Sequence, residues 1–149
     1  MENADFIAYA ENALDYGIMG ILLLMSVVTL WLFIERLMYY KSLRLEDYEN
    51  KDALELDLSD NLSTISAIGA NAPYVGLLGT VIGIMLTFYS LGDIGTVDAK
   101  KIMMGLALAL KATALGLVVA IPAISFYTIL LRKMEKIVVK FDILQEAKK

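Results

Sequence analysis

Three threonines lie within long apolar stretches of this chain, where side chains that can exchange a proton are scarce. Thr80 and Thr87 belong to residues 61–92, which contain no charged residue, and Thr113 belongs to residues 102–131. A hydroxyl group both donates and accepts hydrogen bonds, so threonines that share a face can line a polar path through an apolar layer. A threonine in a helix can also bond back to its own backbone, so a purely structural role stays open.

Small residues accompany the threonines at helical spacing. At about 100° per residue, one face of each stretch is small or hydroxylated and the opposite face is bulky. In the first stretch this face comprises Gly69, Pro73, Gly76, Thr80, Gly83 and Thr87, and Gly79 and Gly83 form a GxxxG step. In the second it comprises Ala109, Thr113, Gly116, Ala120 and Tyr127. Such faces allow close helix packing in lipid, so two interpretations remain: packing seams, or the walls of a polar path.

Lys111 is the only charged residue in residues 102–131. A lysine at the centre of a membrane helix costs about 2.5–3.5 kcal/mol on insertion scales, so its ammonium group needs a partner or access to water. On a helical wheel Lys111 points away from Thr113. We expect its side chain to extend toward a headgroup or an acidic residue such as Asp15 or Asp98.

The composition excludes several kinds of chemistry. The chain has no Cys and no His, which removes thiol nucleophiles, zinc sites and the usual general base, and we predict no metal and no cofactor. It has no Gly-rich phosphate-binding loop and no basic patch interleaved with aromatic residues, so we expect neither an enzyme nor a nucleic-acid-binding protein. No Asp or Glu lies inside the apolar stretches, so a carboxylate that carries protons would have to come from another polypeptide.

The stretches themselves define an all-α integral membrane protein with three transmembrane helices. Crossing the hydrocarbon layer takes about 20 helical residues, and a soluble core helix rarely stays uncharged for so long. The acidic N-terminal segment does not resemble a signal peptide, so we expect the first span to be kept. We divide the chain into a tail (1–15), three transmembrane helices (16–34, 63–91 and 102–131), two connecting segments (35–62 and 92–101) and a C-terminal tail (132–149).

Basic residues indicate the orientation. They gather after the first span and in the C-terminal tail and are absent from residues 1–15, so the N-terminus is predicted to be periplasmic and the C-terminus cytoplasmic. No Gly or Pro lies between Gly20 and Gly69, so the first transmembrane helix is predicted to extend into the cytoplasm. Residues 50–63 are predicted to form a solvated connector, although a helix or a turn also fits their pattern. Helix 3 is predicted to extend as an amphipathic tail with Met134, Ile137, Val138, Phe141 and Leu144 on one side. This stripe needs a partner: residues 35–60, another copy or the membrane surface.

Prolines occur in both patterned spans. Pro73 and Pro122 each remove one backbone donor, so we expect a kink near the cytoplasmic end of the second span and another inside the third. A kink of this kind can shape a pore or a hinge, or can have no function, and the sequence does not choose between them.

Two sequence blocks, ISAIGANAPYVGLLGTVIGIMLTF and LKATALGLVVAIPAISFY, resemble the signature of the ExbB/TolQ/MotA family of proton-channel subunits, and ExbB most closely. The resemblance implies a ring-forming homo-oligomer, a pentamer, in the bacterial inner membrane. The ring would enclose helices of ExbD, a single-span partner with an intramembrane Asp, and proton flow would act through TonB to energise uptake of iron-siderophores and other scarce solutes. Thr80 and Thr113 match the family's pore-facing threonines, and Pro73 and Pro122 match its prolines.

The chain departs from the family pattern at three points. Leu108 occupies the place where ExbB and TolQ usually carry a Glu, Lys111 is unusual at its position, and residues 35–62 are a short form of the family's cytoplasmic domain. These departures shift the proton-carrying role further toward the partner's Asp. Two alternatives remain: a TolQ-like subunit that maintains the cell envelope, and a membrane scaffold that conducts no ions.

Overall fold

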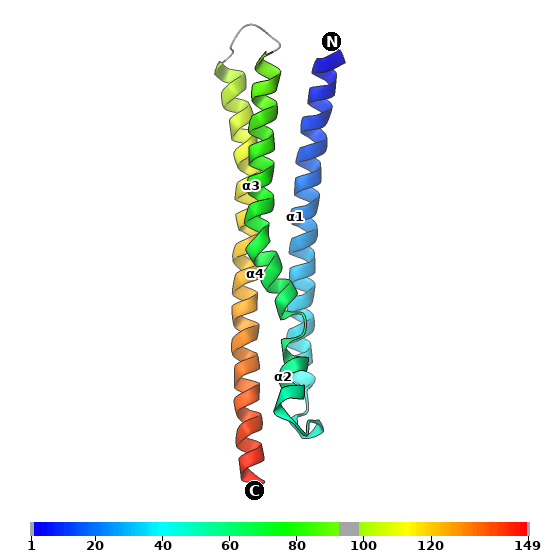
Figure 1. Ribbon diagram of the computed structural model, residues 1–149, viewed down its shortest axis with the longest axis vertical. Helices are drawn as coiled ribbons and strands as arrows, with labels where there is room; N and C mark the ends of the chain where they lie inside the picture. The colour runs from blue at the N-terminus through cyan, green and yellow to red at the C-terminus, as the bar shows by residue number, and fades with distance from the viewer. Residues whose placement is uncertain (1, 93–98, 149) are drawn as a thin grey trace.

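The computed structural model describes residues 2–92 and 99–148, and the described chain is almost entirely helical. Its elements are α1 (Glu2–Ser42), a short 3-10 turn η1 (Leu45–Asp47), α2 (Lys51–Ser59), α3 (Leu62–Gly92) and α4 (Ala99–Ala147). The long helices α1, α3 and α4 run side by side, and the two chain ends lie at opposite ends of the bundle (Figure 1). Most of the predicted loop over 92–101, including Asp98, lies outside the described residues.

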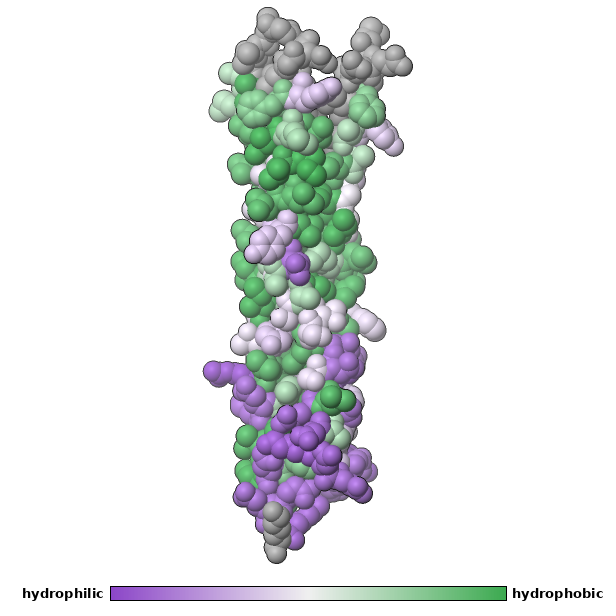
Figure 2. Space-filling view, in the orientation of Figure 1, coloured by the Kyte–Doolittle hydropathy of each residue, from purple (hydrophilic) through white to green (hydrophobic). Residues whose placement is uncertain are grey.

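Each long helix can cross a membrane. They contain 41, 31 and 49 residues, and at 1.5 Å per residue they measure about 60, 45 and 75 Å against about 30 Å of hydrocarbon. Large apolar side chains cover their outer surfaces; Leu23 is 69% exposed, Trp31 66% and Val118 65%. Figure 2 shows this hydrophobic surface over most of the bundle and a hydrophilic surface at the C-terminal end. The prediction of an all-α integral membrane protein with three spans is therefore confirmed.

The core is built on the α3–α4 pair, with α1 packed along it. Ile18 and Leu22 of α1 pack against Ala72 of α3 and against α4. Nearer the C-terminal end, Leu32 packs with Ile65 and other apolar side chains of α3 and α4, and the rings of Phe33 and Phe126 stack with centroids 4.1 Å apart. Small residues on α3 and α4 and larger ones on α1 thus fill the space between the three helices.

Residues 50–63 are not the solvated connector that we favoured from the sequence. Residues 51–59 form α2, and the last two residues of the stretch begin α3. Asn50 caps α2, because its side-chain oxygen accepts hydrogen bonds from the backbone N–H groups of Asp52 and Ala53. Leu54 and Leu58 are fully buried against the amphipathic tail of α4. Burial of these two leucines makes helical packing more favourable than an extended, hydrated segment.

The apolar stripe on the tail therefore finds its partner in its own chain. Val138 and Phe141 are buried against α2, and Met134 and Ile137 pack at the edge of the same cluster. Leu144 lies near the end of the helix and is 46% exposed.

Both prolines lie inside continuous helices, Pro73 in α3 and Pro122 in α4. The N-terminal part of α3 leans toward α1 in Figure 1. Pro73 is half-buried, whereas Pro122 is exposed on the outside of α4. A proline removes one helical hydrogen bond without necessarily ending the helix, because other packing holds the backbone in place.

Candidate functional site

The hydroxyl groups of Thr80 and Thr113 meet between α3 and α4, with their oxygens 2.5 Å apart. Thr80 is 7% exposed, and Thr113 is half-buried. The Thr80 hydroxyl also lies 3.0 Å from the carbonyl oxygen of Ala109 and 3.3 Å from that of Gly76. Each hydroxyl has one proton and two lone pairs, so the pair can be polarised in either direction. A chain of hydroxyl groups that passes a proton requires this property.

Glycines bring the two helices close enough for this contact. A Cβ atom added to Gly76 would lie 2.6 Å from the carbonyl oxygen of Ala112 and 3.1 Å from the Cα atom of Gly116. A Cβ atom added to Gly116 would lie 2.7 Å from the carbonyl oxygen of Ala72. These neighbours are backbone atoms, which cannot rotate away as a side chain can. Gly76 and Gly116 therefore set the separation of α3 and α4 at the level of the threonine pair.

The remaining small residues extend this seam in both directions. A Cβ atom on Gly79 would lie 2.8 Å from the Cβ atom of Ala112, and one on Gly83 would lie 3.0 Å from that of Ala109. Ala120 is 2% exposed. The two small faces predicted from the sequence thus pack against each other. The seam therefore has a packing role.

Thr87 lies on the same side of α3 as Thr80, two helical turns closer to the C-terminal end of α3. It is 7% exposed, and its hydroxyl donates a 2.9 Å hydrogen bond to the carbonyl oxygen of Gly83. A Cβ atom on Gly105 would lie 2.5 Å from the Thr87 hydroxyl oxygen, so α4 has a glycine where this threonine packs. All three threonines singled out in the sequence therefore lie along the α3–α4 seam.

Lys111 pairs with Asp15, one of the two acidic partners expected for it. The Lys111 Nζ atom lies 3.7 Å from Asp15 Oδ2, and the two side chains are 45% and 44% exposed. The pair joins α1 to α4. From the sequence, Asp15 belongs to a tail outside the first span; in the structure it lies within the continuous helix α1. The uninterrupted helical character of residues 2–15, which contain no Gly or Pro, was the available signal.

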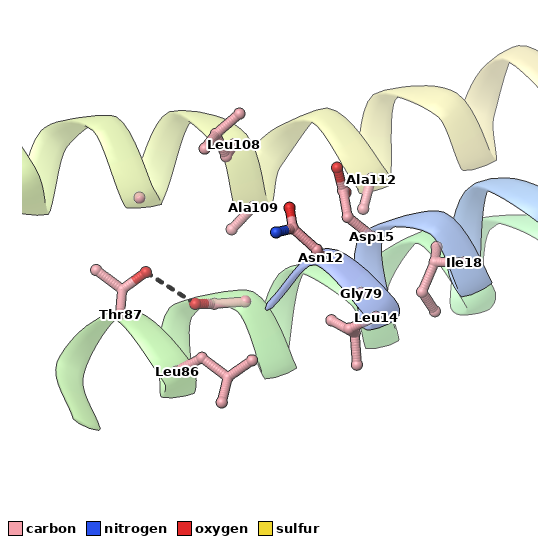
Figure 3. A pocket seen from close by; sticks show the side chains of 12 residues that line it. Asn12, Leu14, Asp15, Ile18, Gly79, Leu86, Thr87, Leu108, Ala109 and Ala112 are labelled. Atoms are coloured by element: carbon pink, nitrogen blue, oxygen red, sulfur yellow. Dashed lines mark hydrogen bonds between the residues drawn. The ribbon is translucent and has the colours of Figure 1, made fainter. Parts of the chain in front are cut away.

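A crevice of about 130 Å³ lies beside this ion pair, between α1, α3 and α4. In Figure 3 the side chains of Asn12 and Asp15 extend from α1 toward α4, and Thr87 lies across the crevice with its bond to the Gly83 carbonyl. Leu108 forms part of the wall. Residues 2–92 and 99–148 hold no cluster of three or more His, Cys, Asp or Glu side chains that could bind a metal ion.

A second polar cluster holds the opposite end of the bundle together. The Arg36 side chain is 7% exposed and bonds to the Glu35 carboxylate at 2.6 Å and to the Asp57 carbonyl oxygen at 3.1 Å. The hydrogen bond from Arg36 lowers the pKa of Glu35. Tyr40 donates a 2.6 Å hydrogen bond to the carbonyl oxygen of Leu58, and burial raises the pKa of Tyr40 to about 12. These contacts attach α2 and the following turn to α1.

Comparison with known proteins places the chain among proton-channel subunits. The model of the MotA/TolQ/ExbB proton channel family matches residues 32–143. A putative biopolymer transport protein ExbB-like 2 of Helicobacter pylori is 54% identical over 133 residues, 89% of each chain. Biopolymer transport protein ExbB of Aquifex aeolicus is 53% identical over 126 residues, 85% of each chain. ExbB of Helicobacter pylori strain J99 is 49% identical over 138 residues, 93% of this chain and 95% of the relative.

Proposed function

Since the chain belongs to the MotA/TolQ/ExbB proton channel family, and so is a membrane transport subunit and not an enzyme, we propose that it works with ExbD as a stator subunit. In this proposal the proton motive force across the bacterial inner membrane drives TonB, which energises uptake of iron-siderophores and other scarce solutes across the outer membrane. Two of its relatives are biopolymer transport proteins ExbB, which supports this assignment over a TolQ-like role in envelope maintenance.

The observation that carries the proposal is the buried Thr80–Thr113 hydroxyl pair. In a seam made mostly of small apolar residues, Thr80 and Thr113 form a polar contact between two membrane helices. Thr80 is buried and Thr113 is half-buried, so the pair extends from the inside of the seam toward the surface of the subunit. Hydroxyl groups in this position can relay a proton delivered at that surface.

A threonine hydroxyl neither releases its own proton nor binds a second one near neutral pH, so the group that carries protons must be an acid such as a carboxyl group. We propose that an intramembrane Asp of ExbD supplies it from a helix enclosed by a ring of five copies of this chain. Each elementary charge that crosses 100 mV releases about 2.3 kcal/mol, so a few protons per cycle suffice for mechanical work. The N-terminus would be periplasmic and the hydrophilic end of the bundle, with α2 and the α4 tail, cytoplasmic, because basic residues gather there.

The test is removal of each hydroxyl group without a change of shape. Thr80→Val and Thr113→Val keep the β-branched volume and remove the hydroxyl. Thr128→Val is the matched control, because Thr128 is exposed on α4 and its hydroxyl bonds only to the Ile124 carbonyl of its own helix. Proton flux is measured in vesicles that contain the chain with ExbD, and TonB-dependent uptake is measured in cells.

We expect both seam variants to lose at least about tenfold in flux and the control to match the wild type. Normal flux and uptake in both seam variants would refute the pore role. If Gly83→Leu and Ala120→Leu break assembly while the valine variants assemble normally, and the wild-type complex conducts no protons, the seam serves packing alone and the protein is a scaffold.

A further inference from the structure

The crevice between α1, α3 and α4 contains a carboxylate that the hydroxyl pair does not use. We propose that Asp15 is a proton-binding site of this subunit, at the end of the bundle nearest the N-terminus, and that it exchanges protons with the path through Thr87. The proposal rests on the proposed function, because a path through the α3–α4 seam is its premise.

The placement of Asp15 is the first argument. Its carboxylate lines the crevice, and it is 44% exposed beside the apolar wall formed by Ile18, Leu108 and Ala112. Of the described acidic and basic side chains, Asp15 of α1 lines the crevice and Lys111 of α4 forms an ion pair with Asp15. Helix α3 adds no charge, because residues 62–92 include no acidic or basic residue. Lys111 offsets the cost of keeping this carboxylate ionised near the membrane.

The size and polarity of the crevice are the second argument. The volume of about 130 Å³ is well above the minimum that one water molecule needs, so the crevice can hold ordered water. A bound water needs two to four polar partners, and Asn12, Asp15 and Thr87 supply them from two sides of the crevice. A hydrated crevice of this kind allows protons to reach the carboxylate.

Continuity with the seam is the third argument. Thr87 lines the crevice and lies seven residues from Thr80 on the same face of α3, which is about 10.5 Å along the helix. Ala109, whose carbonyl oxygen lies 3.0 Å from the Thr80 hydroxyl, also lines the crevice, so the crevice borders the Thr80–Thr113 pair as well as Thr87.

The chemical step is a simple protonation. A hydronium ion in the crevice gives its proton to the ionised carboxylate, which leaves one water and a neutral carboxylic acid. The charge on Asp15 is then lost, and with it the ion pair with Lys111, until the proton leaves again. Proton occupancy is in this way coupled to the contact between α1 and α4.

The experiment compares two variants that break the same ion pair. Asp15→Asn removes the proton-binding group and Lys111→Met keeps it. In vesicles that contain the full chain with its single-span partner, we expect Asp15→Asn to lower proton flux about tenfold to a hundredfold. We expect Lys111→Met and Asp15→Glu to lose less flux than Asp15→Asn, because each retains the carboxylate. Equal losses in Asp15→Asn and Lys111→Met would show a structural clamp and overturn the proposal.

A second measurement does not depend on flux. A hydrophobic carbodiimide reacts with protonated carboxyl groups, and mass spectrometry of the intact complex locates the adduct. We expect an adduct on Asp15 that increases in Lys111→Met, with exposed Asp52 on α2 as the unreactive control. Absence of an Asp15 adduct in a conducting complex overturns the proposal. If Thr80→Val abolishes proton flux but Asp15→Asn leaves it unchanged, the Asp15 proposal is overturned and the proposed function stands. If the wild-type complex shows no proton flux, the proposed function itself is refuted.

Discussion

The close approach of α3 and α4 makes Gly76→Ala the most direct test of the structure. The new Cβ atom would lie 2.6 Å from the carbonyl oxygen of Ala112, whereas real Cβ contacts hardly ever fall below 3.0 Å. The helices must therefore separate by about 0.4 Å or more, because the obstacle is backbone. Overpacking of this kind costs about 1–3 kcal/mol. Alanine also favours a helix over glycine by about 1 kcal/mol, which partly offsets that cost.

Gly20→Ala isolates the packing contribution. Gly20 lies inside α1 with no atom within 4 Å of an added Cβ atom, so this variant gains helix propensity without a clash. The difference between the two variants is therefore the packing cost alone, about 1–3 kcal/mol in the free energy of unfolding. The assay is SDS-titrated unfolding in mixed micelles, followed by the fluorescence of Trp31, the only tryptophan in the chain. Equal midpoints for Gly76→Ala and Gly20→Ala would contradict the helix separation described above.

Three further predictions concern the hydrophilic end of the bundle. Leu54→Ala should lower the free energy of unfolding by about 2–5 kcal/mol and expose residues 43–61 to limited proteolysis. Leu56→Ala is the control, and because Leu56 is 75% exposed it should leave the cleavage rate unchanged. Tyr40→Phe should lower the free energy of unfolding by about 1 kcal/mol, since the Leu58 carbonyl loses its donor; an unchanged thermal midpoint would count against this bond. Because the pKa of Glu35 is lowered in the folded protein, its ionised carboxylate contributes stability above the ordinary pKa of 4.5, and this contribution is lost as pH falls through the lowered pKa. Glu35→Gln should therefore flatten the acid limb of a curve of unfolding free energy against pH. Parallel curves for the variant and the wild type would contradict the Arg36 pairing.

The membrane spans and the packing faces follow directly from the sequence. Hydrocarbon leaves few alternatives to a long uncharged helix, so residues 61–92 and 102–131 define their own structure. The pairing of Gly76 with Gly116 likewise follows from spacing, because two small faces in lipid pack best against each other. The sequence does not show that the Thr80 and Thr113 hydroxyl groups meet, because the relative height of α3 and α4 depends on the whole seam.

The α2 helix and the placement of Asp15 depend on tertiary structure. Leu54, Leu56 and Leu58 alternate with acidic residues, a spacing of two that is typical of strands. Only Leu54 and Leu58, four apart, are buried, and the tail of α4 decides which face packs. Asp15 precedes the uncharged run, and its contact with Lys111 depends on how far α1 is displaced along α4.

The unbroken length of α4 has a mechanical consequence. Thr113 and Phe141 lie 28 positions apart on one helix, which is about 42 Å at 1.5 Å per residue. One continuous helix therefore connects the threonine pair to the cluster that holds α2, and Pro122 lies inside it without ending it. A tilt that a partner imposes on α4 at the threonines would move α2 as well, so force generated in the membrane would be transmitted outside it.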